Sequence, residues 1–222
     1  MAKRDLRGMR QRSQTPDRSH IESPNYAGVV AEYLGLLREL AAIEPPLFVF
    51  GSVAEAVLLD GELSETHGDV DVAIPRTELG LRLRQLAVLG FDVFDVYYEP
   101  RPGLPLVYGS ARGDLALELS LVDFDPAGIP FFAVRTNGRA VAISLPADLF
   151  LWPPTVIDQV EIHTLSPLAL VHVRAGAVAT SAFGPERPGK DDVRQARMID
   201  MLFRNVDRER LRPTITPIDD GW

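Results

Sequence analysis

The spacing of apolar residues along the chain changes from helical to strand-like and back again. In the first part, apolar side chains recur three or four positions apart, which predicts an amphipathic helix over about 23–43. Pro24 suits the first turn of this helix, and Pro45 is expected to stop it. A second helix, with leucines along one face, is predicted over about 76–89.

Short apolar runs in the middle of the chain predict β-strands. Two early strands are expected at about 47–50 and 69–74, separated by a short helix over about 53–59 and a polar loop. From Phe91 onwards apolar residues recur at every second position, which predicts strands at about 92–98, 105–109, 115–124, 131–135 and 139–145. The Asn-Gly pair between the last two strands is the strongest hairpin signal of the chain.

The last third of the chain returns to a helical spacing. Helices are predicted over about 166–180 and 190–203, and the segment after Pro213 is expected to be irregular. This order of elements predicts an α+β (α/β-like) fold, with a mixed β-sheet, flanking helices and a helical C-terminal subdomain.

Three parts of the chain are expected to differ in character. Residues 1–22 read as a disordered basic leader, 23–145 as the core and 146–222 as the helical C-terminal subdomain. The leader lacks an apolar segment and is not expected to be a secretory signal.

Composition excludes several classes of site. The 222 residues are 46% hydrophobic and 24% charged, which is ordinary for a globular chain with a sizeable core. Because the chain contains no cysteine, disulfides, thiolate zinc sites and cysteine nucleophiles are excluded. No apolar run reaches the roughly 18 residues of a membrane span. We expect a cytoplasmic protein that does not bind membranes.

Charge is distributed unevenly. The formal net charge is -8, but the first twenty residues hold six Lys or Arg and two Asp or Glu, so they carry +4 and the remainder -12. An acidic body repels nucleic acid and suits a cationic substrate, or carboxylates that are offset by a metal ion. A solvated leader is the simpler interpretation of the basic segment, and a contact with RNA is the alternative.

Two aspartates two positions apart are the first candidate for chemistry. On a strand Asp69 and Asp71 point to the same face, and Val70, Val72 and Ile74 take the opposite, buried face. Paired carboxylates are costly unless a cation lies between them. Mg²⁺ prefers oxygen ligands and usually shares them with substrate phosphates. Taken alone, however, such a pair is more often a solvated turn.

Gly51-Ser52 and Glu118 are further candidates for a functional site. Glycine allows the backbone to approach a phosphate, and the helix that follows offers free N–H groups to an anion, although an ordinary strand-to-helix turn has the same residues. No Gly-Lys-Ser/Thr follows, so this is not a Walker loop. Glu118 lies between two leucines, where a central strand would require a partner or a metal and an edge strand would expose it to water.

Together these segments resemble the nucleotidyltransferase superfamily, whose signature is Gly-Ser at a strand end, a helix, and then Asp-hydrophobic-Asp on the next strand. Residues 51–73 look like the branch of aminoglycoside adenylyltransferases and lincosamide nucleotidyltransferases, and the likeness extends more loosely over about 47–203. The chain departs from that branch where Val53 replaces a tryptophan, Glu65 replaces a basic residue and Glu118 replaces an aspartate.

This resemblance implies transfer of AMP from ATP to a hydroxyl of a small, cationic, aminoglycoside-like acceptor, with pyrophosphate as leaving group. It implies one or two Mg²⁺ ions, and it leaves open whether Glu118 is a metal ligand or the general base. The implied catalytic and metal-binding residues are Asp69, Asp71 and Glu118, and those implied to contact the triphosphate are Gly51, Ser52 and Lys190.

Two residues that flank the predicted strand 69–74 have expected roles of their own, and two other functions are alternatives to transfer onto a small acceptor. Arg76 is expected in a salt bridge, with a phosphate contact as the alternative, and His67 is expected to order its loop rather than bind metal. A toxin-type nucleotidyltransferase that modifies tRNA or protein is one alternative function, supported by the basic leader. A catalytically impaired, nucleotide-binding homologue is the other.

Overall fold

The computed structural model of the chain describes residues 26–63, 69–180 and 190–218. The predicted leader at 1–22 lies outside these residues. Along the chain the elements are α2 (Tyr26–Ala41), β1 (Phe48–Phe50), α3 (Gly51–Asp60), β2 (Val70–Pro75), η2 (Arg76–Glu78), α4 (Leu79–Val88), β3 (Asp95–Tyr98), β4 (Val107–Arg112), β5 (Leu115–Phe124), β6 (Pro130–Thr136), β7 (Arg139–Ser144), β8 (Thr155–Ile157), β9 (Val160–Ile162), α5 (Pro167–Thr180), α6 (Lys190–Leu202), η3 (Arg208–Leu211) and β10 (Ile215–Pro217). The elements predicted between β1 and α6 are present, with ends shifted by a few residues.

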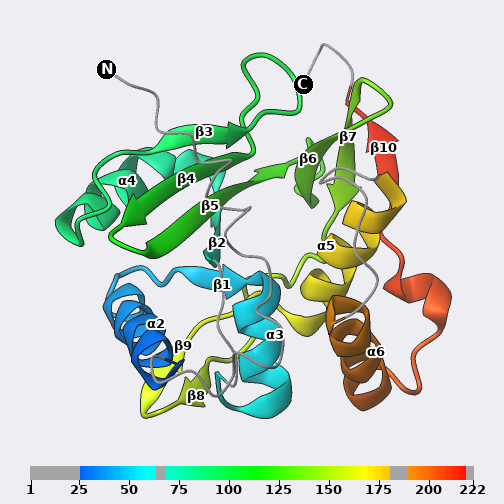
Figure 1. Ribbon diagram of the computed structural model, residues 1–222. Coiled ribbons are helices and arrows are strands. Elements are labelled where there is room, and N and C mark those ends of the chain that lie inside the picture. The colour runs from blue at the N-terminus through cyan, green and yellow to red at the C-terminus, as the bar shows by residue number, and fades with distance from the viewer. Residues whose placement is uncertain (1–25, 64–68, 181–189, 219–222) are drawn as a thin grey trace.

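Among the described residues, eight strands form one mixed sheet. The order is β1-β2-β5-β6-β7-β10, and β4 pairs with β5 and carries β3 at its other edge. β2 and β5 run parallel, and the other neighbours are antiparallel. Figure 1 shows α4 behind β3 and β4, and α5 beside β6 and β7. The predicted α+β fold with a mixed sheet is confirmed.

The register of the sheet aligns three strands at one level. Phe50 of β1 is paired with Asp71 of β2, and Asp71 is paired with Glu118 of β5. Paired residues on neighbouring strands point to the same face of a sheet. The two carboxylates therefore project from the same face, although they come from distant parts of the sequence.

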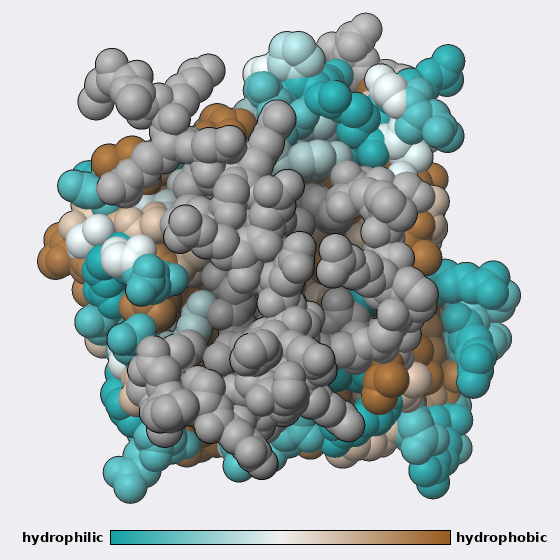
Figure 2. Space-filling model, viewed as in Figure 1, coloured by the Kyte–Doolittle hydropathy of each residue, from teal (hydrophilic) through white to brown (hydrophobic). Residues whose placement is uncertain are grey.

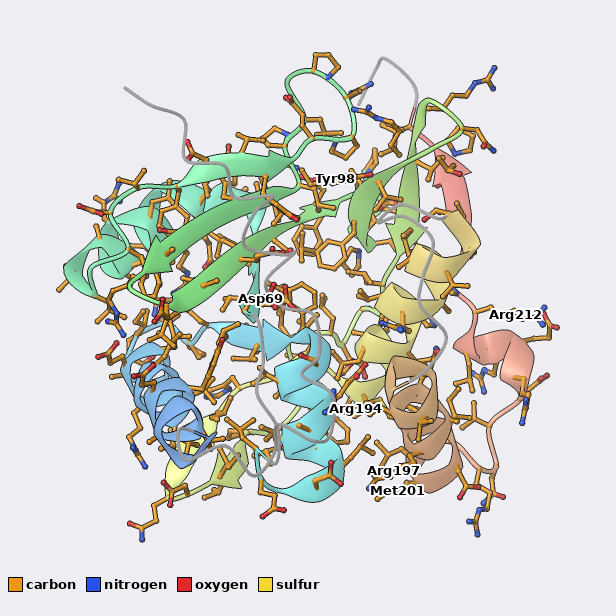
Figure 3. The ribbon with its side chains drawn as sticks, viewed as in Figure 1. Asp69, Tyr98, Arg194, Arg197, Met201 and Arg212 are labelled. Atoms are coloured by element: carbon orange, nitrogen blue, oxygen red, sulfur yellow. The ribbon has the colours of Figure 1, made fainter. Side chains whose placement is uncertain are left out.

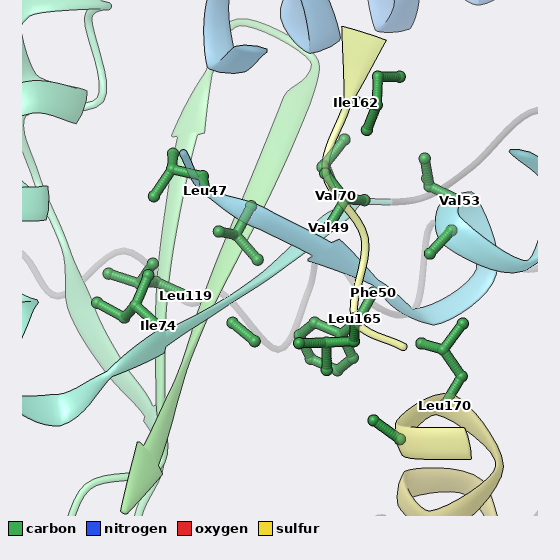
Figure 4. Packing of buried hydrophobic residues seen from close by; sticks show 14 of the residues in the cluster. Leu47, Val49, Phe50, Val53, Val70, Ile74, Leu119, Ile162, Leu165 and Leu170 are labelled. Carbon is green, nitrogen blue, oxygen red and sulfur yellow. The ribbon is translucent and has the colours of Figure 1, made fainter. Parts of the chain in front are cut away.

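The opposite face of β2 and β5 belongs to the hydrophobic core. Val70, Val72 and Ile74 are buried, as predicted, and so are Leu117 and Leu119 of β5. Figure 4 shows Val49 of β1 beside Val70 of β2, and Ile74 of β2 beside Leu119 of β5. Full burial of such a side chain contributes roughly 1.5–3 kcal/mol, so this packing holds β2 rigidly beside β5.

The C-terminal part contains the two predicted helices, α5 and α6, together with three short strands that were not predicted from the sequence. β8 and β9 form a separate two-stranded sheet, and β10 extends the main sheet by pairing with β7. Each of these strands has three residues, which is too short for an alternating pattern to be recognised. Leu170 and Met198 share one core cluster with Leu117, and the division at residue 145 stays a prediction.

None of the described helices is both long and apolar enough to cross a membrane. Figure 2 shows the face of the molecule that is seen in Figure 1. Hydrophilic side chains lie around its periphery, with smaller apolar groups among them. The most exposed large apolar side chains include Val88, Leu151 and Val156, which lie on different segments. Scattered apolar residues of this kind are usual on protein surfaces.

Gly176 determines how closely α5 approaches the sheet. A Cβ at this position would overlap Cγ2 of Ile143 and lie 2.8 Å from its Cδ1. Because Ile143 is buried, Gly176→Ala is expected to lower the free energy of unfolding by about 1–3 kcal/mol, measured by urea denaturation.

Gly35→Ala is the matched control for this substitution. Gly35 also lies within a helix, but a Cβ there meets nothing within 4 Å. The same change should therefore raise the free energy of unfolding by up to about 1 kcal/mol, through helix propensity. Equal effects of the two substitutions would show that the contact with Ile143 is unimportant.

Candidate active site

The bend between β1 and α3 brings backbone against a carboxylate. Gly51 has a φ of +68°, a left-handed conformation that favours glycine. A Cβ at this residue would overlap Oδ2 of Asp71 and lie 3.2 Å from its Cγ. The first N–H groups of α3, at Gly51 and Ser52, have no acceptor within the helix itself. The bend therefore presents anion-binding groups directly beside Asp71.

A cavity of about 260 Å³ opens over this face of the sheet. Gly51, Ser52, Asp71 and Glu118 all line it. Glu118 is only 7% exposed and lies on a central strand, which settles the choice between a central and an edge position. Four of the six residues implied to form the site thus meet in one cavity.

Asp69 is the carboxylate that immediately precedes β2. β2 begins at Val70, so Asp69 lies just before the hydrogen-bonded ladder. It is not among the described residues that line the cavity. Within the described part of the chain, no group of three or more His, Asp or Glu side chains is arranged to hold a metal ion. The structure brings two of the three expected carboxylates together, and the role of Asp69 stays a prediction.

The residues present fit a hard divalent cation in their chemistry. Asp71 and Glu118 offer carboxylate oxygens from adjacent, paired positions, and oxygen is the ligand that Mg²⁺ prefers. The missing side chain at Gly51 leaves room beside Oδ2 of Asp71, which any Cβ would fill. A shared cation would also relieve the repulsion between the two carboxylates.

The charge of Asp69 affects the pKa of Tyr33 in α2. Burial first, and then the negative charges of Asp69 and Glu32, raise the pKa of the Tyr33 phenol from 10.0 to about 12. Asp69 is therefore close enough to α2 to act on it electrostatically. Figure 3 shows Asp69 at the start of β2, near the centre of the molecule.

Titration of Tyr33 gives a direct test of this arrangement. In metal-free buffer, the absorbance of ionised tyrosine should include a phase centred near pH 12, and Tyr33→Phe should remove it. Because the pKa is higher in the folded than in the unfolded chain, the protonated phenol stabilises the fold fully below pH 10. That contribution, about 3 kcal/mol, is lost as the pH rises towards 12.

Asp69→Asn supplies the control for this titration. It should lower the pKa of Tyr33 only partly, since burial is the larger cause. A pKa unchanged by Asp69→Asn would mean that the two side chains do not interact.

Of the other residues singled out in the sequence, the structure describes the side chain of Arg76 but not those of Lys190 and His67. Arg76 forms a two-pronged salt bridge with Asp123, with Nε and Nη2 at 2.5 and 2.7 Å from the carboxylate oxygens, so the predicted salt bridge is confirmed. Lys190 is the first residue of α6, but its side chain lies outside the described part of the structure. His67 also lies outside the described residues.

Three polar residues of the cavity were not predicted from the sequence. Glu55, Ser120 and Arg174 line it together with the expected residues. Glu55 is a charged residue inside the apolar stretch 53–59, and Ser120 lies two positions after Glu118, on the same face of its strand. Both signals are visible in the sequence. Arg174 has no such signal, because the packing of α5 alone brings it to the cavity.

Helix α6 is held against α3 by charged side chains. Arg197 Nη2 lies 2.7 Å from Oδ1 of Asp60, and Arg194, which is buried, lies between α3 and α6 in Figure 3. Burial lowers the pKa of the Arg194 guanidinium, and the charges of Glu55 and Asp60 partly oppose this. These contacts position the wall of the cavity that carries Glu55.

Comparisons with solved structures agree with this fold. The solution structure of the antibiotic-resistance factor ANT(2'')-Ia is similar, with a TM-score of 0.57 and 18% identity over 82% of this chain and 88% of that chain. The crystal structure of ANT(2'')-Ia in complex with adenylyl-2''-tobramycin has a TM-score of 0.55 and 18% identity, over 82% of this chain and 92% of that chain. The resemblance inferred from the sequence is thus confirmed for the fold.

A more distant likeness is to the lincosamide antibiotic adenylyltransferase LnuA in its lincomycin-bound crystal structure. Its TM-score is 0.49 at 14% identity, over 77% of this chain and 94% of that chain. No protein-family model and no curated protein matches the chain. At 18% identity the similarity to ANT(2'')-Ia shows a shared fold alone, so the chemistry has to be argued from the site.

Proposed function

We propose that this chain is a Mg²⁺-dependent nucleotidyltransferase that moves AMP from ATP to a hydroxyl group of a small acceptor. The observation that carries the proposal is the meeting of Asp71 and Glu118 with the Gly51-Ser52 bend in one cavity. Carboxylates for a metal beside N–H groups for a phosphate are the combination that nucleotidyl transfer requires. The fold shared with ANT(2'')-Ia supports the same reaction class.

Each side chain has a role that follows from its position. Asp71 and Glu118 would hold Mg²⁺, with Asp69 as the candidate third ligand; when bound, the ion offsets phosphate charge and stabilises the attacking and leaving oxygens. Backbone N–H groups of Gly51 and Ser52 bind the β- and γ-phosphates at the start of α3. In this proposal Glu118 also accepts the proton of the acceptor hydroxyl, as general base.

Two cations add to the binding of the triphosphate in this proposal. Arg174 is the cation among the described residues that line the cavity, and Lys190 begins the helix beside it. Against them stand the carboxylates of Glu55, Asp71 and Glu118 in the same lining. This excess of carboxylates, together with the net charge of -8, favours an acceptor that carries positive charge.

The proposal is tested by label transfer. The protein is incubated with Mg²⁺ and each nucleoside triphosphate labelled at the α-phosphate, together with a panel of aminoglycosides, lincosamides, tRNA and protein. Label on a small hydroxyl compound, with ATP as the best donor and none without Mg²⁺, is the expected result. Label on tRNA or protein would instead identify a toxin-type enzyme.

Binding of Mg²⁺-ATP distinguishes an active enzyme from a nucleotide-binding homologue without activity. At 100 times its dissociation constant, Mg²⁺-ATP should stabilise the folded chain by about 2.7 kcal/mol and raise the melting temperature accordingly. A rise in melting temperature with no transfer to any acceptor would identify a nucleotide-binding homologue without activity. Absence of both would contradict the assigned site.

A further inference from the structure

Glu55 is a buried carboxylate of the cavity to which the proposed function gives no contact with metal or phosphate. It belongs to α3, is only 7% exposed and lines the cavity together with Gly51 and Ser52. Because positions three apart on a helix lie on the same side, Glu55 lies about one turn beyond Ser52 on α3. A buried carboxylate is costly unless cations offset its charge, and beside a triphosphate the mutual repulsion adds to that cost.

Two arginines of the C-terminal helices lie within electrostatic reach of Glu55. Burial lowers the pKa of the Arg194 guanidinium in α6, and the charge of Glu55 is the largest of the charges that oppose this. Arg174 of α5 lines the same cavity as Glu55. The cavity measures about 260 Å³, below the roughly 300–1,000 Å³ of usual ligand pockets, so opposite charges in its lining interact at short range.

The two arginines are placed for different tasks. Arg194 is only 5% exposed, lies between α3 and α6 in Figure 3 and is not among the described residues that line the cavity. It therefore offsets Glu55 from the protein side. Arg174 faces the cavity, and its planar guanidinium carries five N–H donors on more than one edge. One edge can pair with a carboxylate while another edge donates to a phosphate.

We infer that Glu55 is a positioning residue for the triphosphate: its carboxylate holds one edge of the Arg174 guanidinium, so that another edge faces the phosphates at the start of α3. This inference rests on the proposed function, because it takes the triphosphate to lie at the Gly51-Ser52 bend. An arginine that is oriented before the nucleotide arrives loses less freedom on binding. The carboxylates of the cavity then divide their work, with Asp71 and Glu118 for the metal and Glu55 for the phosphates through Arg174.

Glu55→Gln gives opposite results for a positioning role and for simple repulsion. The substitution keeps the shape of the side chain and removes its charge. If Glu55 only repelled Mg²⁺-ATP, which is itself an anion, its removal would strengthen binding. If Glu55 positions Arg174, a charge-assisted hydrogen bond to phosphate is lost, and the dissociation constant of Mg²⁺-ATP should rise by about tenfold. Isothermal titration calorimetry without acceptor measures this constant.

Asp60→Asn is the matched control. Asp60 is the last residue of α3, pairs with Arg197 of α6 and is not among the described residues that line the cavity. The same loss of charge from the same pair of helices should change the dissociation constant by less than about twofold. Equal weakening by Asp60→Asn and Glu55→Gln would show that Glu55 only holds α6 against α3, and would overturn the inference.

A double-mutant cycle identifies the residue through which Glu55 acts. In the Arg174→Gln background, Glu55→Gln should cause no further weakening of Mg²⁺-ATP binding, because the guanidinium to be positioned is gone. A further fall of about tenfold in this background would mean that Glu55 acts independently of Arg174, and would overturn the inference.

Glu55→Asp decides the matter if Glu55→Gln does not fold. It keeps a negative charge beside the buried Arg194 but shortens the side chain by one methylene, which lengthens any hydrogen bond to Arg174. Binding of Mg²⁺-ATP about threefold weaker than that of the wild type supports the inference, and binding at the wild-type level or tighter overturns it. Unchanged or tighter binding by a folded Glu55→Gln variant overturns it too and leaves the proposed function intact. Absence of binding by the wild type contradicts the proposed function itself.

Discussion

Asp71→Asn is expected to reduce the rate of nucleotidyl transfer by about a thousandfold or more, without loss of the folded structure. Asp71 lies at the point where the Gly51 bend, β2 and Glu118 meet. The amide keeps the shape of the side chain but removes the charge that holds a divalent cation. A loss of several kcal/mol of transition-state stabilisation follows, which is the size expected when a metal contact is removed.

The stability of this variant distinguishes a functional carboxylate from a structural one. Because Asp71 and Glu118 are paired in register on adjacent strands, removal of one charge relieves repulsion between them. In metal-free buffer the melting temperature should equal or exceed that of the wild type. A clear fall would indicate that Asp71 serves mainly to hold the sheet together.

Asp114→Asn is the matched control for the rate. Asp114 is an exposed carboxylate immediately before β5, the strand that carries Glu118, and it is not among the described residues of the cavity. The same loss of charge there should change the rate of transfer by less than about twofold, since exposed charges are screened by solvent. If both variants lost activity equally, the effect would come from net charge and not from the site.

Gly51→Ala is the second change with a large expected effect. The substitution forces alanine into a left-handed conformation, at a cost of about 1–2 kcal/mol, and drives its Cβ into Oδ2 of Asp71. The carboxylate or the bend has to move, and a displacement of about 1 Å at a reacting centre costs roughly a hundredfold in rate. We expect at least this loss, together with weaker binding of Mg²⁺-ATP by calorimetry.

Gly61→Ala isolates the contact from the strain. Gly61 also has a φ of +68°, but a Cβ there meets nothing within 4 Å. The two variants should lose similar stability from backbone strain, about 1–2 kcal/mol, whereas only Gly51→Ala should lose activity. Activity at the wild-type level in Gly51→Ala would show that the close approach to Asp71 has no part in catalysis.

Much of the site was predictable from the sequence because its signals are local. The alternation from Val70 to Ile74 predicts one buried face, since burial of every second side chain is a property of a single strand. Gly51 was recognisable because it stands where a strand turns directly into a helix. Glu118 was recognisable because a charged residue among leucines needs a specific environment.

Other parts depended on contacts between distant segments. Arg174 reaches the cavity only because α5 packs over the sheet, with Gly176 against Ile143. β10 exists as a strand only because β7 offers it an edge. The place of Asp69 depends on where the ladder of β2 begins, and a pattern of alternating residues does not locate that point to within one residue.

The sequence by itself determined the helices and the longer strands, the face of β2 that is buried, and the residue types that are available for metal and phosphate. The tertiary structure alone decided that β2 lies beside β5, so that Asp71 meets Glu118, and that apolar side chains line the same cavity. The physical reason is that periodicity reports the exposure of each side chain separately. The choice of neighbour is made by the packing of the whole chain, in which many weak contacts act together.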